Sequence, residues 1–174
     1  RRLREFGRLL EKAEEEQVSA IIFDLDFDRP ATDLDFHKAL EVVSDLLVPT
    51  ISYISSSAIG PGALLALGTD SIYMGPSAIV GSAGIAVIPA DSEEKGAQTD
   101  KQKQSILKAR ARSLASKRGH RVDVAEALVD SERQISAPWG DVTDKGEVLT
   151  LTADEAVKKI CLLYTSDAAD ELCS

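Results

Sequence analysis

Apolar residues recur at helical spacing in two places within the first fifty residues. One stripe comprises Leu3, Phe6, Leu10 and Ala13, and the other comprises Phe36, Leu40, Val43 and Leu47. Residues three or four apart share one face of an α-helix, so each stripe predicts an amphipathic helix that packs against a core. The second helix is expected to begin at Thr32 or Asp33 as its N-cap and to end before Pro49.

Short apolar runs separate and follow these two helices. Residues 18–26 contain the β-branched pair Ile21 and Ile22, which predicts a buried strand. Similar runs predict strands at residues 50–54, 71–74 and 78–80 and a short apolar helix at residues 63–67. Helices that alternate with short strands indicate an α/β layered domain with mainly parallel strands.

The second half of the chain continues this alternation. The polar residues 91–100 are expected to form a surface loop, and a basic helix is expected over residues 101–118 with Gly119 as its C-cap. Further predictions are a helix at residues 124–129, a hairpin within residues 139–151 that turns at 144–146, and a helix that starts at the capping box of Thr152 and Glu155. No repeat or internal boundary is evident, so residues 1–160 are expected to form a single domain.

Both ends of the chain are expected to differ from a native protein. Residue 1 is Arg and no signal or transit peptide is visible, so we expect native sequence to be missing at both ends. The segment from Cys161 to Glu171 looks like a translated sequencing adapter, and residues 161–174 are therefore expected to be a non-native tail. Both cysteines, Cys161 and Cys173, lie in this tail, which argues against a disulfide framework or a zinc site. We expect no metal and no cofactor.

The charge of the chain limits the classes of partner. The 174 residues contain 20 Lys and Arg against 29 Asp and Glu, a formal net charge of -9 at pH 7. Nucleic-acid binding needs a basic surface, so no nucleic-acid partner is expected. Residues 46–69 and 71–90 are uncharged and long enough to span a membrane. Their prolines disfavour a lipid-exposed helix, so membrane contact is expected only through segments outside this sequence.

Two adjoining segments carry a resemblance to a protease family. Residues 49–70 and 71–85 resemble, without a gap, the nucleophile segment of signal peptide peptidase A and of NfeD-type membrane serine proteases. Residues 112–119 and 151–156 are similar to later landmarks of the NfeD type. The resemblance implies the ClpP/crotonase-like fold, a spiral of β-β-α units, and a tendency to form homo-oligomers. It also implies a membrane-associated location and leaves an extracytoplasmic one open.

The resemblance also implies a Ser/Lys mechanism whose nucleophile is missing here. In the family, a Ser at the start of the short helix attacks after a Lys from a later helix has removed its proton, which requires hydrogen-bond reach. The resemblance aligns Gly60 with this Ser, and glycine has no side chain that could attack. It aligns Lys101 or Lys103 with the base, although a solvated surface charge is the commoner role for either lysine.

The oxyanion hole that the resemblance implies is altered as well. The family has a Pro-Gly-Gly element after its first strand, and the corresponding residues here end at Pro30, which has no N–H to donate. Asp28 would add an opposing charge nearby. A second donor follows the nucleophile, and here that residue is Pro61, again without N–H. Loss of one such donor typically costs about 10²–10³ in rate, so we expect a catalytically degenerate serine protease homologue.

An active Ser/Lys peptidase with another nucleophile is the main alternative. Ser55, Ser56 and Ser57 lie just upstream of Gly60, but they are expected to fill the turn before the short helix. The two histidines, His37 and His120, are expected on the surface, which argues against a Ser-His-Asp triad.

A crotonase-like acyl-CoA enzyme is a third possibility, because residues 58–70 also resemble the glycine-rich segment of that family. Leu64 stands where a hydratase carries a glutamate, which disfavours this function. The sequence therefore favours a degenerate protease homologue that binds peptide or protein segments, or acts as a scaffold, in a membrane-associated assembly. A peptide could lie along strand edges near Gly60, because strand addition uses only main-chain groups.

Overall fold

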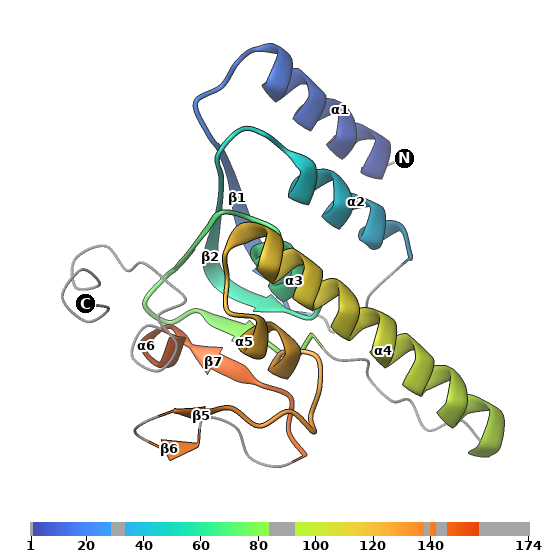
Figure 1. Ribbon diagram of the computed structural model, residues 1–174. Coiled ribbons are helices and arrows are strands. Elements are labelled where there is room, and N and C mark those ends of the chain that lie inside the picture. The colour runs from blue at the N-terminus through green and yellow to red at the C-terminus, as the bar shows by residue number, and fades with distance from the viewer. Residues whose placement is uncertain (1, 29–33, 84–92, 138–139, 142–145, 157–174) are drawn as a thin grey trace.

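The computed structural model describes residues 2–28, 34–83, 93–137, 140–141 and 146–156. Its helices are α1 (Arg2–Glu15), α2 (Leu34–Asp45), α3 (Pro61–Leu67), α4 (Glu93–Arg118), α5 (Val122–Ala127) and α6 (Ala153–Glu155). Its strands are β1 (Ile21–Phe27), β2 (Thr50–Ile59), β3 (Ser71–Met74), β4 (Ile79–Gly81), β5 (Ser136–Ala137), β6 (Gly140–Asp141) and β7 (Thr150–Thr152). This alternation, visible in Figure 1, confirms the predicted α/β class. The expected tail, residues 161–174, lies outside the described residues.

One mixed sheet organises the domain. Its strands follow the order β1-β2-β4-β7, and β3 also pairs with β2. β1, β3 and β4 run parallel to β2, whereas β7 is antiparallel to β4. β2 pairs with β3 through residues 51–54 and with β4 through residues 57–59. This long strand therefore carries the chain from one part of the sheet to the other and delivers it to the start of α3.

A bulge interrupts the middle of β2, and Ser55, Ser56 and Ser57 lie in it. Two extra residues of β2 are accommodated opposite the interval between Leu25 and Phe27 of β1. Within this bulge, the Ser55 hydroxyl donates to the Leu25 carbonyl at 3.3 Å, and the Ser57 hydroxyl donates to the Phe27 carbonyl at 2.9 Å. The hydroxyls join the two strands where the regular ladder is interrupted. The expectation that these serines lie in a turn is therefore wrong, because the strand continues to Ile59.

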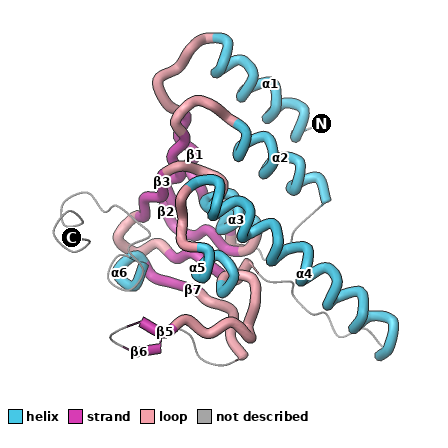
Figure 2. The backbone as a smooth tube through the Cα atoms, viewed as in Figure 1, coloured by secondary structure: helices cyan, strands magenta, loops and turns pink. Residues whose placement is uncertain are grey.

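α3 is the central helix of the core, as Figure 2 shows. All of its residues are buried, and it contacts the sheet on one side and α2 and α4 on the other. Pro61 occupies its first turn, where the missing N–H breaks no intrahelical hydrogen bond. A Cβ on Gly62 would lie 2.9 Å from the Cβ of Phe27, so glycine at this position allows β1 to approach the helix closely.

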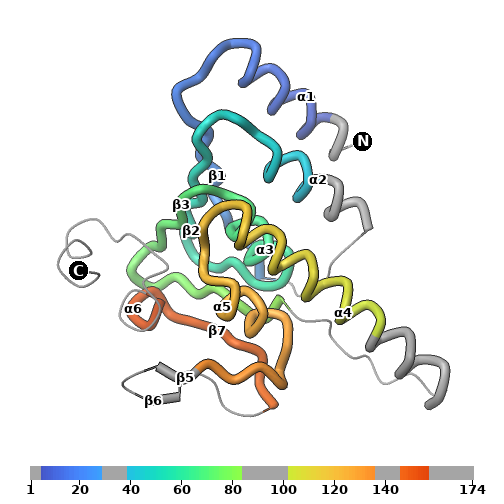
Figure 3. The backbone as a smooth tube through the Cα atoms, in the orientation of Figure 1, coloured from blue at the N-terminus to red at the C-terminus, as the bar shows by residue number. Residues whose placement is uncertain are grey.

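α4 is a basic helix that lies between acidic neighbours. It passes across α3 in the view of Figure 3 and contacts α2, α3 and α5. Its ion pairs include Arg110 with Glu41 and Lys117 with Asp45 of α2, Arg112 with Glu126 of α5, and Lys108 with Asp130. Asp130 is buried, but the other three pairs are at least partly exposed, so each of those three stabilises the fold by no more than about 1 kcal/mol. Their common effect is to neutralise the basic helix where it packs.

Two predictions for the second half are wrong. The polar residues expected to form a loop at 91–100 are helical from Glu93 onward. Acidic residues favour a helix N-terminus and Ala, Gln and Lys are good helix formers, so polarity did not distinguish the two states. The predicted hairpin about residues 144–146 is also wrong, because β6 pairs with β5 and β7 pairs with β4.

The expected capping box at the start of the last helix is confirmed, since Thr152 and Glu155 exchange side-chain to backbone hydrogen bonds. Within the described ranges, no helix is both long and apolar enough to cross a membrane.

Candidate functional site

Gly60 alone forms the turn between β2 and α3. Its backbone has φ 62° and ψ −117°, a conformation that glycine adopts without strain and other residues do not. The Gly60 N–H donates to the carbonyl of Gly81 at 3.0 Å, which fixes the turn against β4. A sharp strand-to-helix turn of this kind presents the nucleophile in hydrolases with a nucleophile elbow. Gly60 has the backbone of such a turn and no side chain to act from it.

The other residues expected in a catalytic site are only partly placed by the structure. Pro61 is buried beside Gly60 and has no N–H to donate. Lys103 is exposed on α4, and within the described part of the chain it makes no hydrogen bond to Gly60. Lys101 belongs to the same helix, but its side chain lies outside the described residues, as does Pro30. The assignment of the base stays a prediction.

The structure also describes the candidate serines of an active peptidase and the leucine that stands at the acid position of an acyl-CoA enzyme. Ser55 and Ser57 donate to β1 carbonyls, and Ser56 is exposed on β2. Among the described residues, no lysine or histidine hydrogen-bonds to any of these serines. Leu64 is fully buried in α3 and provides no acid for proton transfer to an acyl-CoA substrate.

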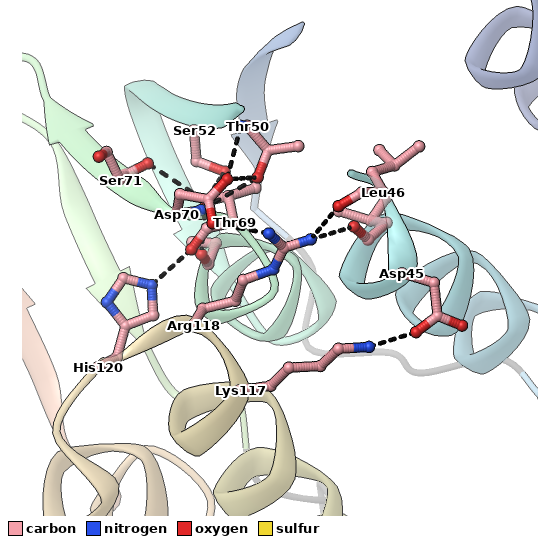
Figure 4. A network of polar contacts seen from close by, with 12 residues as sticks. Asp45, Leu46, Thr50, Ser52, Thr69, Asp70, Ser71, Lys117, Arg118 and His120 are labelled. Atoms are coloured by element: carbon pink, nitrogen blue, oxygen red, sulfur yellow. Dashed lines mark hydrogen bonds and ion pairs between the residues drawn. The ribbon is translucent and has the colours of Figure 1, made fainter. Parts of the chain in front are cut away.

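A polar network holds the opposite end of α3, as Figure 4 shows. Oδ2 of Asp70, which follows α3, accepts hydrogen bonds from the Thr50 N–H at 2.7 Å and the Thr50 hydroxyl at 2.8 Å. Its Oδ1 forms an ion pair with Nη1 of Arg118 at 2.6 Å. Nη2 of Arg118 donates to the carbonyls of Val43 and Leu46 at the C-terminal end of α2. One guanidinium thereby joins α4, α2 and the turn after α3.

The surroundings of Asp70 keep its carboxylate ionised. Burial alone would raise its pKa, but the hydrogen bonds from Thr50 and the Arg118 guanidinium outweigh burial and hold the pKa below the ordinary value of 3.8. Neither Asp70 nor Arg118 was predicted from the sequence to have a role. A signal was present, because Asp70 is the only charged residue within residues 46–90. A charge in such a stretch needs a partner when the stretch is buried.

His120 is half-buried, so its expected place on the surface is wrong. Gly119 has φ 77°, which lets the chain reverse after α4 and brings His120 back to the turn after α3. There its Nε2 lies 2.6 Å from the Thr69 carbonyl. Burial lowers the pKa of His120 below 6.5 and outweighs the Thr69 hydrogen bond and the Asp70 charge, which raise it. The side chain of His37, on α2, lies outside the described residues.

The parallel strands, the buried helix α3 and the sharp turn at Gly60 define the class of this protein, an α/β domain with a strand-to-helix turn at its centre. Within this class, the chain belongs to the NfeD1b N-terminal domain family, whose model matches residues 3–173. The resemblance to NfeD-type proteases is thereby confirmed.

A curated relative and two solved structures extend this result. The chain is 27% identical over 169 residues to the membrane protein NfeD1b of Bacillus subtilis (strain 168), a match that covers 95% of this chain and 35% of that protein. The chain thus spans about a third of the length of this relative. The relative's name supports membrane association for the family.

Both solved structures come from the 1510-N membrane protease. A variant of the membrane-bound stomatin-specific protease in complex with a substrate peptide has a TM-score of 0.69 and 21% identity, with 98% of this chain and 71% of that chain covered. The protease specific for a stomatin homolog from Pyrococcus horikoshii has a TM-score of 0.65 and 22% identity, with 98% and 69% covered. These structures share the fold.

Proposed function

We propose that this domain is a catalytically degenerate homologue of an NfeD-type serine protease that binds protein segments without cleaving them. The observation that carries the proposal is Gly60 at the strand-to-helix turn, because its positive φ suits glycine and no nucleophile is present there. Pro61 supports it, since one amide donor of an oxyanion hole is missing. Pro30, in a segment outside the described residues, would remove another. Lys101 or Lys103 would then be a base without a hydroxyl to deprotonate.

The main competing function is an active Ser/Lys peptidase that uses a different serine. The hydroxyls of Ser55 and Ser57 are engaged with carbonyls of β1, which supports a structural role for both. Ser56 is exposed and is the remaining candidate. The buried Leu64 supports setting the acyl-CoA function aside.

The proposed ligand is an extended segment of a membrane-associated partner protein. Such a segment could add as a strand beside the Gly60 turn, because strand addition needs only main-chain donors and acceptors. The Bacillus relative is named a membrane protein, and the solved structures are of a membrane protease specific for stomatin or a stomatin homolog. A stomatin-like membrane protein is therefore the first partner to test. We also propose that the domain forms homo-oligomers and acts as a scaffold in the assembly.

Peptide cleavage by the chain and two variants tests the loss of catalysis. Gly60→Ser and Gly60→Ala both place a Cβ at the same positive φ, and each is expected to lose about 1–3 kcal/mol of stability. Only Gly60→Ser adds a hydroxyl, so Gly60→Ala is its matched control. We expect the parent and Gly60→Ala to leave stomatin-derived and unrelated peptides intact.

The outcomes of this assay separate the two functions. Cleavage by Gly60→Ser alone would support the assignment of position 60 and of a lysine base. Cleavage by the parent would contradict the proposal, and Ser56→Ala would then test the remaining candidate nucleophile. Urea unfolding at the assay temperature checks that each variant is folded under the conditions of the assay.

Peptide binding is tested by amide hydrogen exchange with a stomatin-like peptide. Added protection is expected in β1, an edge strand of the described sheet whose Phe27 lies against Gly62 next to the turn, because the Gly60 N–H and both edges of β4 are already hydrogen-bonded. The control peptide has the same length but carries proline at alternate positions, which removes main-chain N–H donors. Equal protection by both peptides, or none by either, would argue against strand addition.

A further inference from the structure

Among the residues that the structure describes, no helix lies over one face of the parallel sheet. In β1, Phe23 and Leu25 are buried beneath the helices, whereas Ile22 is 66% exposed on the opposite face. Ile22 lies beside Ile51 of β2 in the parallel register, and in the next row Tyr53 of β2 lies beside Tyr73 of β3. We name this surface of Ile22, Ile51, Tyr53 and Tyr73, with the acids that border it, the open face.

The open face is more apolar than an exposed strand surface normally is. Parallel strands are usually covered on both faces, yet Tyr53 is 41% exposed here. In Figures 1 and 2, the helices α1, α2, α3 and α4 lie together on the other side of β1 and β2. Contiguous exposed apolar residues with polar residues at their border are typical of an interaction site.

The border of the open face is negatively charged. Asp24 lies directly beside Tyr53 in the strand register, and Asp26 follows on the same face of β1. Both are exposed, and no cation among the described residues pairs with either. Two copies stacked through this face would bring carboxylates together within a desolvated interface, which opposes self-association. A partner that carries Lys or Arg beside its apolar residues avoids this repulsion.

We propose that the open face docks a cationic amphipathic segment of a partner protein. Its apolar side chains cover Ile22, Ile51 and Tyr53, and its cations meet Asp24 and Asp26. The acidic border makes the surface selective, because an acidic amphipathic segment would meet the same carboxylates unfavourably. Docking on this surface makes no use of the Gly60 backbone and does not depend on whether the domain is catalytic.

The test measures binding of a short helical peptide with leucine on one face and lysine on the other. The chain is observed by amide chemical shifts, at low and at high salt. We expect shifts in β1 and β2, and binding that weakens with salt. Asp24→Asn combined with Asp26→Asn should weaken binding roughly tenfold. Ile22→Thr should also weaken binding, and the fold should tolerate this substitution because Ile22 is exposed.

A matched control removes two charges elsewhere. Glu14 and Glu15 are exposed on α1, and Glu14→Gln with Glu15→Gln should leave binding unchanged. Equal weakening by the two double variants would reduce the effect to net charge and overturn the proposal. It is also overturned if the glutamate version of the peptide binds as well as the lysine version. A dimer that dissociates with Ile22→Thr in sedimentation, without peptide, would assign the face to a second copy instead.

Discussion

Replacement of Arg118 should destabilise the domain far more than replacement of its neighbour Lys117. Arg118 is only 9% exposed and holds together three segments that are distant in sequence, through Asp70 and through the Val43 and Leu46 carbonyls. Arg118→Met keeps most of the apolar stem and removes the guanidinium. The perturbation is therefore the loss of three charge-assisted hydrogen bonds with little loss of packing.

The size of the effect follows from the surroundings of those hydrogen bonds. Each bond from a charged group contributes about 1.5–3 kcal/mol, which sets an upper limit. Three features reduce it: Asp70 is 42% exposed, it keeps its hydrogen bonds from Thr50, and the Nε of Arg118 is buried without a partner among the described residues. We expect a net loss of about 2–4 kcal/mol, a large part of the 5–15 kcal/mol typical of a domain.

Urea unfolding at neutral pH measures this loss, with Lys117→Met as the matched control. Lys117 precedes Arg118 by one residue on α4 and forms an ion pair with Asp45 of α2, but the two side chains are 48% and 72% exposed. Its replacement should cost less than about 1 kcal/mol. If Arg118→Met cost no more than Lys117→Met, the network would not stabilise the fold and the reasoning would be refuted. A double-mutant cycle with Asp70→Asn then isolates the ion pair from the two carbonyl contacts.

Two further predictions concern pH and glycine geometry. Because the pKa of His120 lies below 6.5 in the folded state, protons favour the unfolded state, and the free energy of unfolding should fall as pH drops from 7 to 5. His120→Gln should flatten this dependence, whereas the lowered pKa of Asp70 acts mainly below about pH 5; an unchanged slope in the variant would contradict the assignment. Gly81→Ala places a Cβ 2.3 Å from the Leu149 carbonyl oxygen at φ 147°, and urea unfolding should show a loss above roughly 3 kcal/mol. Gly7→Ala, in a helix with open space around it, should instead stabilise by about 0.5–1 kcal/mol.

The sequence predicted the features of the fold that depend on local pattern. The first two helices, the strands that pair in parallel and the capping box at Thr152 follow from hydrophobic period and from capping chemistry. The turn residue Gly60 was also found from sequence, because its neighbours in the chain resemble a known segment. These features need no knowledge of distant contacts.

The features that sequence reasoning missed depend on contacts between distant segments. The bulge in β2 depends on its register with β1, which the local sequence does not reveal. Ser55 and Ser57 were therefore predicted to lie in a turn, although their hydroxyls donate to carbonyls thirty residues earlier in the chain. Arg118 reads as one cation among many on a basic helix, and only the fold shows that it is buried against Asp70. His120 was misplaced for the same reason, because the turn at Gly119 determines where it points.

Contacts at the two ends of α3 hold this helix in place. At its N-terminal end, Gly60 adopts a backbone that a serine would adopt only with strain, so glycine at this position stabilises the turn. At its C-terminal end, Asp70 and Arg118 anchor the helix independently of any catalytic group. Neither anchor needs a hydroxyl at position 60. The strand-to-helix turn is thus maintained by backbone geometry at one end of α3 and by an ion pair at the other, neither of which requires a catalytic side chain.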